Sequence, residues 1–149
     1  MKMPDTRQSL WLLLAASGYL MLMASGFIFV DVSYLHSLSH EAFRYMCHQQ
    51  PARSFGLDEQ TMAVCARCFG IYAGFFAASL AGLLAPVKFS TSLRFALIVT
   101  AAAFLLNTAD VTGNFLGWWS NTAATRFVAG LVAGMSLILI IYTAVKPKS

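Results

Sequence analysis

Four long stretches of the chain are apolar and nearly free of charge, and polar residues gather between them. The first stretch carries no charged residue from Gln8 to Val30, and the last carries none from Phe127 to Val145. A helix that crosses the hydrocarbon core of a bilayer needs about 20 mainly apolar residues. The pattern therefore predicts an all-α membrane protein, a single domain whose four transmembrane helices lie at about 10–31, 64–86, 92–110 and 125–145.

The first predicted span follows a short basic segment that contains Lys2 and Arg7, an arrangement also found in secretory signal peptides. Its apolar run is longer than the roughly 7–15 residues of a signal-peptide core. Residues 24–26, Ala-Ser-Gly, also make a poor cleavage site. We therefore expect this helix to be retained as the first span.

A polar region, residues 32–63, separates the first two predicted spans. Between His36 and Cys47, polar and apolar residues alternate at spacings that favour a short helix at the membrane interface. Pro51 would end such a helix, and Gly56 to Glu59 is typical of a turn. We expect this region to form a polar loop that carries one short interfacial helix.

The remaining connections carry helix caps and interfacial aromatic residues. Ser90, Thr91 or Ser92 can cap the third span after the break at Pro86. Gly113 to Asn121 is expected to be a loop, and its adjacent tryptophans, Trp118 and Trp119, are of the type favoured at headgroup level.

Composition and charge support a membrane location and exclude a nucleic-acid-binding role. The chain is 58% hydrophobic and 11% charged, whereas soluble domains carry about 25% charged residues. Its net charge is +4, but most basic residues flank the apolar runs, as topology signals do. We therefore predict a multi-pass protein of the cell membrane.

Four spans place both termini on one side, and the basic residues indicate which side that is. Six basic residues would lie with the termini, namely Lys2, Arg7, Lys88, Arg94, Lys146 and Lys148. Four would lie on the opposite side, namely Arg44, Arg53, Arg67 and Arg126. Because cytoplasmic loops are enriched in lysine and arginine, we expect cytoplasmic termini and an outer polar loop.

The second and fourth spans share a pattern of small residues. Gly70 and Gly74 are spaced like Gly130 and Gly134, and each pair follows an arginine. Such spacing lets helix backbones approach closely, so ordinary helix packing is the favoured interpretation. An internal repeat of two helical hairpins is the alternative.

All three cysteines lie near the start of the second span and suggest a metal site. Cys65 and Cys68 have the two-ligand spacing of zinc sites, and Cys47 and His48 would complete a Cys₃His set. Adjacent residues point about 100° apart on a helix, so Cys47 and His48 can share an ion only if the backbone bends. His40 or His36 is the alternative fourth ligand.

A redox role is the competing interpretation of the same cysteines. A Cys-x-x-Cys pair at a helix N-terminus, beside Arg67, has the features that lower a thiol pKa. Cys47 would then pass electrons on, and the dithiol would exchange them with membrane quinone. A covalent c-type haem would need histidine directly after Cys68, where Phe69 stands, so that option is excluded.

A second group of polar residues lies around the predicted ends of the third and fourth spans. Asp110 is an acid at membrane depth, which marks a candidate functional residue and possible catalytic base. It could equally pair with an arginine to orient the helices. Three arginines could clamp an anion or form salt bridges and headgroup contacts instead. The candidate ligand-binding residues are Arg53, Arg67, Asp110, Asn121 and Arg126.

With these residues in view, the chain resembles a family of small predicted membrane proteins without assigned function, domain-of-unknown-function family two thousand and eighty-five. Its first signature is matched at Cys47, His48, Gln49, Arg53, Ser54, Phe55, Cys65, Arg67, Cys68, Gly70, Tyr72 and Gly74. Its second is matched at Asp110, Gly117, Asn121, Arg126, Gly130 and Gly134. The second departs from the family at Val111, at Asn114 and in the order of residues 120–122. The resemblance implies His48 rather than His40 as ligand and supplies no reaction.

We therefore predict a zinc site of Cys47, His48, Cys65 and Cys68 at the outer membrane face, beside a pocket for a small or lipidic anion. A closed set of ligands would make the zinc structural. A loosely held ligand would let it activate water, with Asp110 as base, in a hydrolase. A quinone-linked thiol-disulfide oxidoreductase is the first alternative, and a transporter or accessory subunit the second. The bilayer, a lipid or quinone ligand, and a homo-oligomer or larger membrane complex are the expected partners.

Overall fold

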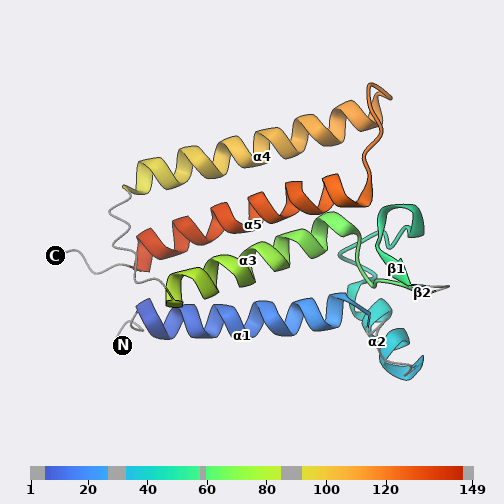
Figure 1. The fold of residues 1–149 in the computed structure, drawn as a ribbon, viewed down its shortest axis with the longest axis horizontal. Helices are drawn as coiled ribbons and strands as arrows, with labels where there is room; N and C mark the ends of the chain where they lie inside the picture. Colours follow the sequence, from blue (N-terminus) through green and yellow to red (C-terminus); the bar gives the residue numbers. More distant parts are fainter. Residues whose placement is uncertain (1–5, 27–32, 58–59, 85–91, 146–149) are drawn as a thin grey trace.

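The computed structural model describes residues 6–26, 33–57, 60–84 and 92–145. Four long helices run side by side: α1 (Thr6–Ala24), α3 (Ala66–Leu84), α4 (Leu93–Phe115) and α5 (Ala123–Val145) (Figure 1). In space α1 packs on α3, α3 on α5, and α5 on α4. The central pair, α3 and α5, begins at the same end of the bundle (Figure 1).

The shorter elements gather at that end of the bundle (Figure 1). They are α2 (Ser33–Phe43), a 3₁₀ turn η1 (Pro51–Arg53), and the strands β1 (Gly56–Leu57) and β2 (Gln60–Thr61). The strands are antiparallel, with Gly56 opposite Thr61 and Leu57 opposite Gln60. A short helix is present as predicted, although it spans Ser33–Phe43 rather than 36–47, and the predicted turn at 56–59 begins as a strand. Residues 58–59 lie outside the described residues.

Three of the described helices are long and apolar enough to cross a membrane, namely Ala66–Leu84, Leu93–Phe115 and Ala123–Thr143. The first predicted span, 10–31, includes residues 27–32, which lie outside the described residues. Within its described part, residues 10–24 belong to the 19-residue helix α1, which begins earlier, at Thr6. Helix α4 begins at Leu93 as expected, because the Ser92 hydroxyl accepts a hydrogen bond from the Phe95 N–H (3.3 Å) and caps the helix.

The C-terminal end of α4 differs from the expectation of a loop from Gly113 to Asn121, which was wrong for residues 113–115. The helix continues to Phe115 because Gly113 lies buried beneath the Trp119 side chain, where a Cβ would overlap the indole ring. Gly117 then ends the helix with a φ of +74°. The Trp118 N–H donates to Gly113 O (2.9 Å) and the Gly117 N–H to Asn114 O (3.3 Å), which is the Schellman arrangement.

Glycines set the distance between α3 and α5. A Cβ at Gly70 or Gly74 would overlap the backbone carbonyl of Phe127 or Leu131 on α5. In the other direction, Gly130 faces the carbonyl of Arg67 on α3 and Gly134 that of Ile71. The expected close packing of two small-xxx-small faces is confirmed, because only glycine leaves room for these carbonyls.

Side-chain hydrogen bonds join α4 to α5 inside the apolar region. Thr100 Oγ1 donates to Ser136 O (3.0 Å), and Asn107 Nδ2 donates to Ala129 O (2.9 Å). Polar side chains in a bilayer stabilise helix pairs in this way because lipid offers them no partner. Helix α4 is therefore attached to the central pair along one face.

Substitution of Gly134 by alanine tests the glycine contact between α3 and α5. The added Cβ would overlap Ile71 O, so we expect the free energy of unfolding in detergent to fall by about 1–3 kcal/mol. The control is Ala102→Val on the exposed side of α4, which should change it much less. A rise in stability for Gly134→Ala, as alanine gives in an unconstrained helix, would contradict the close contact.

Candidate functional site

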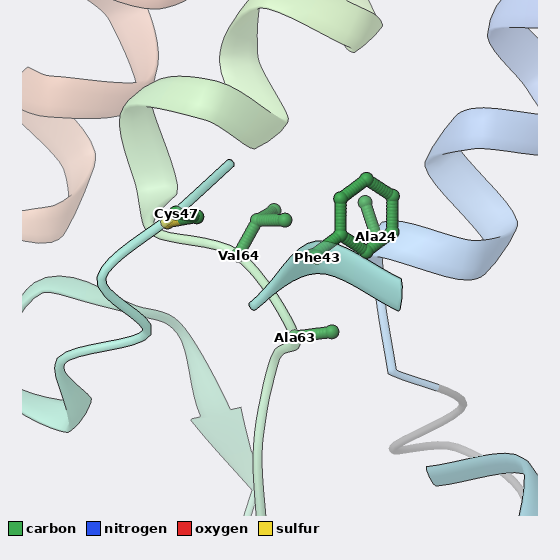
Figure 2. Close-up of a cluster of buried hydrophobic side chains, with 5 residues drawn as sticks. All are labelled: Ala24, Phe43, Cys47, Ala63 and Val64. Carbon is green, nitrogen blue, oxygen red and sulfur yellow. The ribbon is translucent and has the colours of Figure 1, made fainter. Parts of the chain in front are cut away.

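Cys47 is held in place by a small apolar core at the polar end of the bundle (Figure 2). The core comprises Ala24 at the end of α1, Phe43 at the end of α2, and Ala63 and Val64 just before α3. The Cys47 N–H donates to Phe43 O (2.9 Å), so its backbone continues the last turn of α2. The Cys47 side chain is buried, which fixes the direction of its thiol.

Cys65 and Cys68 lie at the start of α3 and bring their thiols to Cys47. The Cys65 carbonyl accepts the Phe69 N–H (3.1 Å), so Cys65 stands at the N-terminus of the helix. Cys65 Sγ lies 3.5 Å from Cys68 Sγ, and the Cys65 N–H donates to Cys47 Sγ at 3.1 Å. All three Sγ atoms lie within 4.8 Å of one another. We call Cys47, Cys65 and Cys68 the cysteine cluster.

The spacing of the cysteine cluster fits a tetrahedral metal ion. Zn–S bonds of about 2.3 Å place two thiolates about 3.8 Å apart in a tetrahedron, close to the 3.5 Å between Cys65 and Cys68. The Cys65 N–H that donates to Cys47 Sγ holds that sulfur beside the start of α3. The arrangement could therefore take up a thiophilic metal with small side-chain movements.

Local hydrogen bonds also favour the charged form of Cys65, which lies just outside α3. The hydrogen bond with the Cys68 thiol lowers the pKa of Cys65 to about 5, although burial opposes the shift. Weaker hydrogen bonds from the Cys68 backbone and the Cys47 side chain act in the same direction. A thiolate is both the metal ligand and the nucleophile of disulfide exchange, so this feature serves either chemistry.

The histidines do not join the cysteine cluster in this structure. His48 is exposed, and the backbone bends at the next residue, Gln49, which has a φ of +48°. The Gln49 amide Nε2 donates to His40 O (2.6 Å) and holds that bend. His40 Nε2 lies 3.1 Å from Thr61 O, and His36 Nδ1 lies 2.9 Å from Gly26 O. A role for His48 as fourth ligand stays a prediction.

Asp110 is engaged in a polar contact between three parts of the fold. Its Oδ2 forms an ion pair with Arg67 on α3 and accepts a hydrogen bond from Asn121 Nδ2 (2.7 Å), which precedes α5. The side chains of Arg67 and Asp110 are 18% and 28% exposed, so the pair is mostly shielded from solvent. Asp110 therefore orients Arg67 and ties the end of α4 to α3.

Arg53, Arg67 and Arg126 line one cavity of about 330 Å³, together with Cys65 and Asn114. Arg126 NH2 donates to Asn114 Oδ1 (3.4 Å). Arg67 Nε and Arg126 NH1 are buried and have no hydrogen-bond partner among the described residues. We call this space the arginine cavity. Because Cys65 lines the cavity and also belongs to the cysteine cluster, the two lie next to each other.

The arginine cavity joins three of the five predicted ligand residues and leaves two outside its wall. Asp110 and Asn121 do not line it; Asp110 pairs with Arg67 and accepts a hydrogen bond from Asn121. The wall also includes Val111 and Phe115, which were not among the predicted ligand residues. Phe115 lies in the segment that was expected to be loop, and Val111 lies between that segment and the predicted span 92–110; their i, i+4 spacing was the signal available.

Residues 47–140 match the sequence family described as predicted membrane protein (DUF2085). The chain is 34% identical over 99 residues to an uncharacterised protein of Methanothermobacter thermautotrophicus, covering 66% of this chain and 86% of the relative. An uncharacterised protein of Methanocaldococcus jannaschii is 31% identical over 106 residues, which is 68% of this chain and 65% of that relative. No solved structure matches the chain. The matched family segment contains the whole cysteine cluster and the three cavity arginines.

The variant Asp110→Asn tests the contact between Asp110 and Arg67. Loss of the charge leaves a mostly shielded guanidinium without its counter-charge, so we expect the free energy of unfolding in detergent to fall by about 1–3 kcal/mol. The matched control is Glu41→Gln, which breaks the exposed pair with Arg44 (63% and 60% exposed) and should cost about 1 kcal/mol or less. Equal losses in the free energy of unfolding would show that the Asp110–Arg67 pair stabilises the fold no more than an exposed ion pair does.

Proposed function

Because the chain belongs to the family of predicted membrane proteins (DUF2085), we propose that it holds a metal ion, zinc, at one membrane face and binds an anion beside it. This membership confirms the family resemblance that the sequence signatures indicated. The observation that carries the proposal is the shared position of Cys65. It belongs to the cysteine cluster and also lines the arginine cavity.

The proposed topology has four spans, with α1 and the apolar residues after it forming the first. The start of α1 and the end of α5 lie at the same end of the bundle (Figure 1), as an even number of spans requires. The excess of basic residues on that side supports cytoplasmic termini in the cell membrane. The cysteine cluster and the arginine cavity then lie at the outer face.

The proposed metal site has three thiolate ligands, with His48 as the predicted fourth. Three thiolates and an imidazole suit zinc in tetrahedral geometry. Cys47 and Cys65 are already linked through the N–H to Sγ hydrogen bond, which holds two of the ligands in place. A turn of the exposed His48 side chain and its backbone toward the cluster would close the set.

The proposed anion pocket is the arginine cavity. Guanidinium groups bind carboxylate and phosphate oxygens in paired hydrogen bonds, and Arg67 Nε and Arg126 NH1 have no hydrogen-bond partner among the described residues. The charge of Asp110 is already engaged by Arg67 and Asn121. This arrangement favours a positioning role for Asp110 over that of a catalytic base.

A quinone-linked thiol-disulfide oxidoreductase is the second candidate function. It is favoured by the 3.5 Å between Cys65 Sγ and Cys68 Sγ, because these thiols need only a small approach to form a disulfide. Cys47 lies within reach as the thiol that would exchange with it. The metal proposal and the redox proposal require different states of the same three sulfurs, so one measurement separates them.

Metal content is the measurement that tests the proposed zinc site. We expect about one zinc per chain after purification in detergent with the thiols kept reduced, and near-complete loss of it in Cys47→Ser, because one of three thiolates is removed. His48→Ala should lower the affinity for zinc by about 10- to 100-fold if His48 is the fourth ligand. His40→Ala is its matched control and should retain the metal.

Absence of metal in the wild-type protein would contradict the zinc site. If the same sample carried a Cys65–Cys68 disulfide that mild reductant opens, the redox candidate would stand in its place. Loss of zinc in His40→Ala but not in His48→Ala would identify His40 on α2, rather than His48, as the fourth ligand.

The topology is tested with single cysteines in a chain whose three native cysteines are replaced by serine. Trp118→Cys, at an exposed site in the α4–α5 connection, should react with a membrane-impermeant maleimide in intact cells. Leu93→Cys, exposed at the opposite end of α4, should react only after the membrane is opened. The reverse pattern would invert the proposed orientation.

A further inference from the structure

The arginine cavity lies where two helix N-termini meet. Arg67 stands in the first turn of α3 and Arg126 in the first turn of α5, and both helices begin at this end of the bundle (Figure 1). Helix N-termini carry partial positive charge that adds to the guanidinium charges. Asp110 neutralises one arginine, and two cavity guanidinium groups remain without a carboxylate partner among the described residues. The cavity therefore favours an anion.

The number of donors in the arginine cavity favours phosphate over carboxylate. Three guanidinium groups reach it from η1, α3 and α5, and each is a planar fork with several N–H donors. A carboxylate offers two oxygens in one plane, whereas a phosphate monoester such as that of phosphatidic acid offers three unesterified oxygens on a tetrahedral centre. Convergence of donors from three directions matches the tetrahedral group better than the planar one.

One wall of the arginine cavity is apolar and leads out along α4. Phe115 and Val111 line the cavity and are 88% and 51% exposed. They begin a continuous exposed face of the helix that we call the α4 stripe, which comprises Phe115, Val111, Thr108, Phe104, Ala101 and Leu97. Their spacing alternates between four and three residues, which keeps them on one side of a helix.

The α4 stripe faces the surroundings of the bundle because α4 stands at the end of the row of helices. Its main packing partner is α5. In a bilayer, an exposed apolar face on a spanning helix meets lipid chains. The stripe therefore joins a lipid-facing surface to a cationic cavity at one end of the helix, with the cavity at headgroup depth.

We propose that the arginine cavity binds the phosphate of a membrane lipid whose apolar chain lies along the α4 stripe. The proposal rests on the anion pocket proposed above and names its ligand class. A lipid in the bilayer already has this orientation, with its phosphate at the headgroup level and its chain parallel to a spanning helix. Binding removes the lipid phosphate from water and pairs it with Arg53, Arg67 and Arg126.

The test compares ligands that differ in one feature each, by calorimetric titration of the full chain in neutral detergent. Dihexanoyl phosphatidic acid should bind about tenfold or more tightly than inorganic phosphate, since burial of two methylene groups contributes about 1.6 kcal/mol. Dihexanoylglycerol, which lacks the phosphate, should show no saturable binding. Hexanoate, which carries a carboxylate on the same chain, should bind more weakly than phosphatidic acid.

Variants separate the phosphate site from the chain site. Arg126→Gln and Arg53→Gln should each weaken binding of both phosphate ligands by about tenfold or more. The matched control is Arg44→Gln, an arginine exposed next to α2 and outside the cavity, which should leave binding unchanged. Phe115→Ala should weaken the binding of phosphatidic acid but not that of inorganic phosphate. Leu106 is exposed on the opposite side of α4, so Leu106→Ala should change neither affinity.

The outcomes distinguish failure of the lipid proposal from failure of the anion-pocket proposal on which it rests. Binding of neither phosphate ligand would overturn both. Equal affinity for inorganic phosphate and phosphatidic acid, with no effect of Phe115→Ala, would leave the anion pocket and overturn the lipid ligand. Hexanoate binding as tightly as phosphatidic acid would replace phosphate with carboxylate. Arg53 is exposed, so Arg53→Gln keeps the test decisive if Arg126→Gln does not fold.

Discussion

The close contact between α3 and α5 determines where every part of the site lies. Glycines on each helix leave room for backbone carbonyls of the other helix. One of these carbonyls is that of Arg67, which faces Gly130. The first turns of the two helices are therefore held next to each other. Arg67, Arg126 and the helix start at Cys65 cannot separate without breaking this backbone contact. The other elements surround the first turns of α3 and α5, whose relative position the glycine contacts determine.

The outer helices complete the site from either side of this pair. The end of α1 contributes Ala24 to the core that holds Cys47, and α4 contributes Asp110, Asn114 and two apolar residues of the cavity wall. Each edge helix packs mainly against one long helix, α1 against α3 and α4 against α5, since the four long helices form a row. Ion pairing and hydrogen bonds therefore carry part of the attachment of α4, through Asp110, Asn107 and Thr100.

Much of this arrangement could be predicted from residue patterns, for identifiable reasons. Charge-free runs located the long helices, because a bilayer excludes charge over a fixed length. The spacing of Cys65 and Cys68 located two thiols of the cluster, because residues three apart share a face of a helix. Gly113 was assigned to the loop that carries Trp118 and Trp119, whereas it lies in the last turn of α4 and accommodates the Trp119 ring that folds back on it. Because the predicted third span ended at residue 110, the helical i, i+4 relation between Val111 and Phe115 was not applied, and both residues were missed.

Cys65 gives the site a thermodynamic property that neither half would have alone. Its thiol belongs to the cysteine cluster, and the same side chain forms part of the wall of the arginine cavity. Any change in the charge of the cluster, whether by metal uptake or by oxidation, alters the electrostatic potential that an anion meets in the cavity. Such coupling is reciprocal, so the anion proposed for the cavity would change the metal affinity or the redox potential of the cluster by the same free energy. The proposed metal or redox equilibrium and the proposed anion equilibrium would therefore be linked.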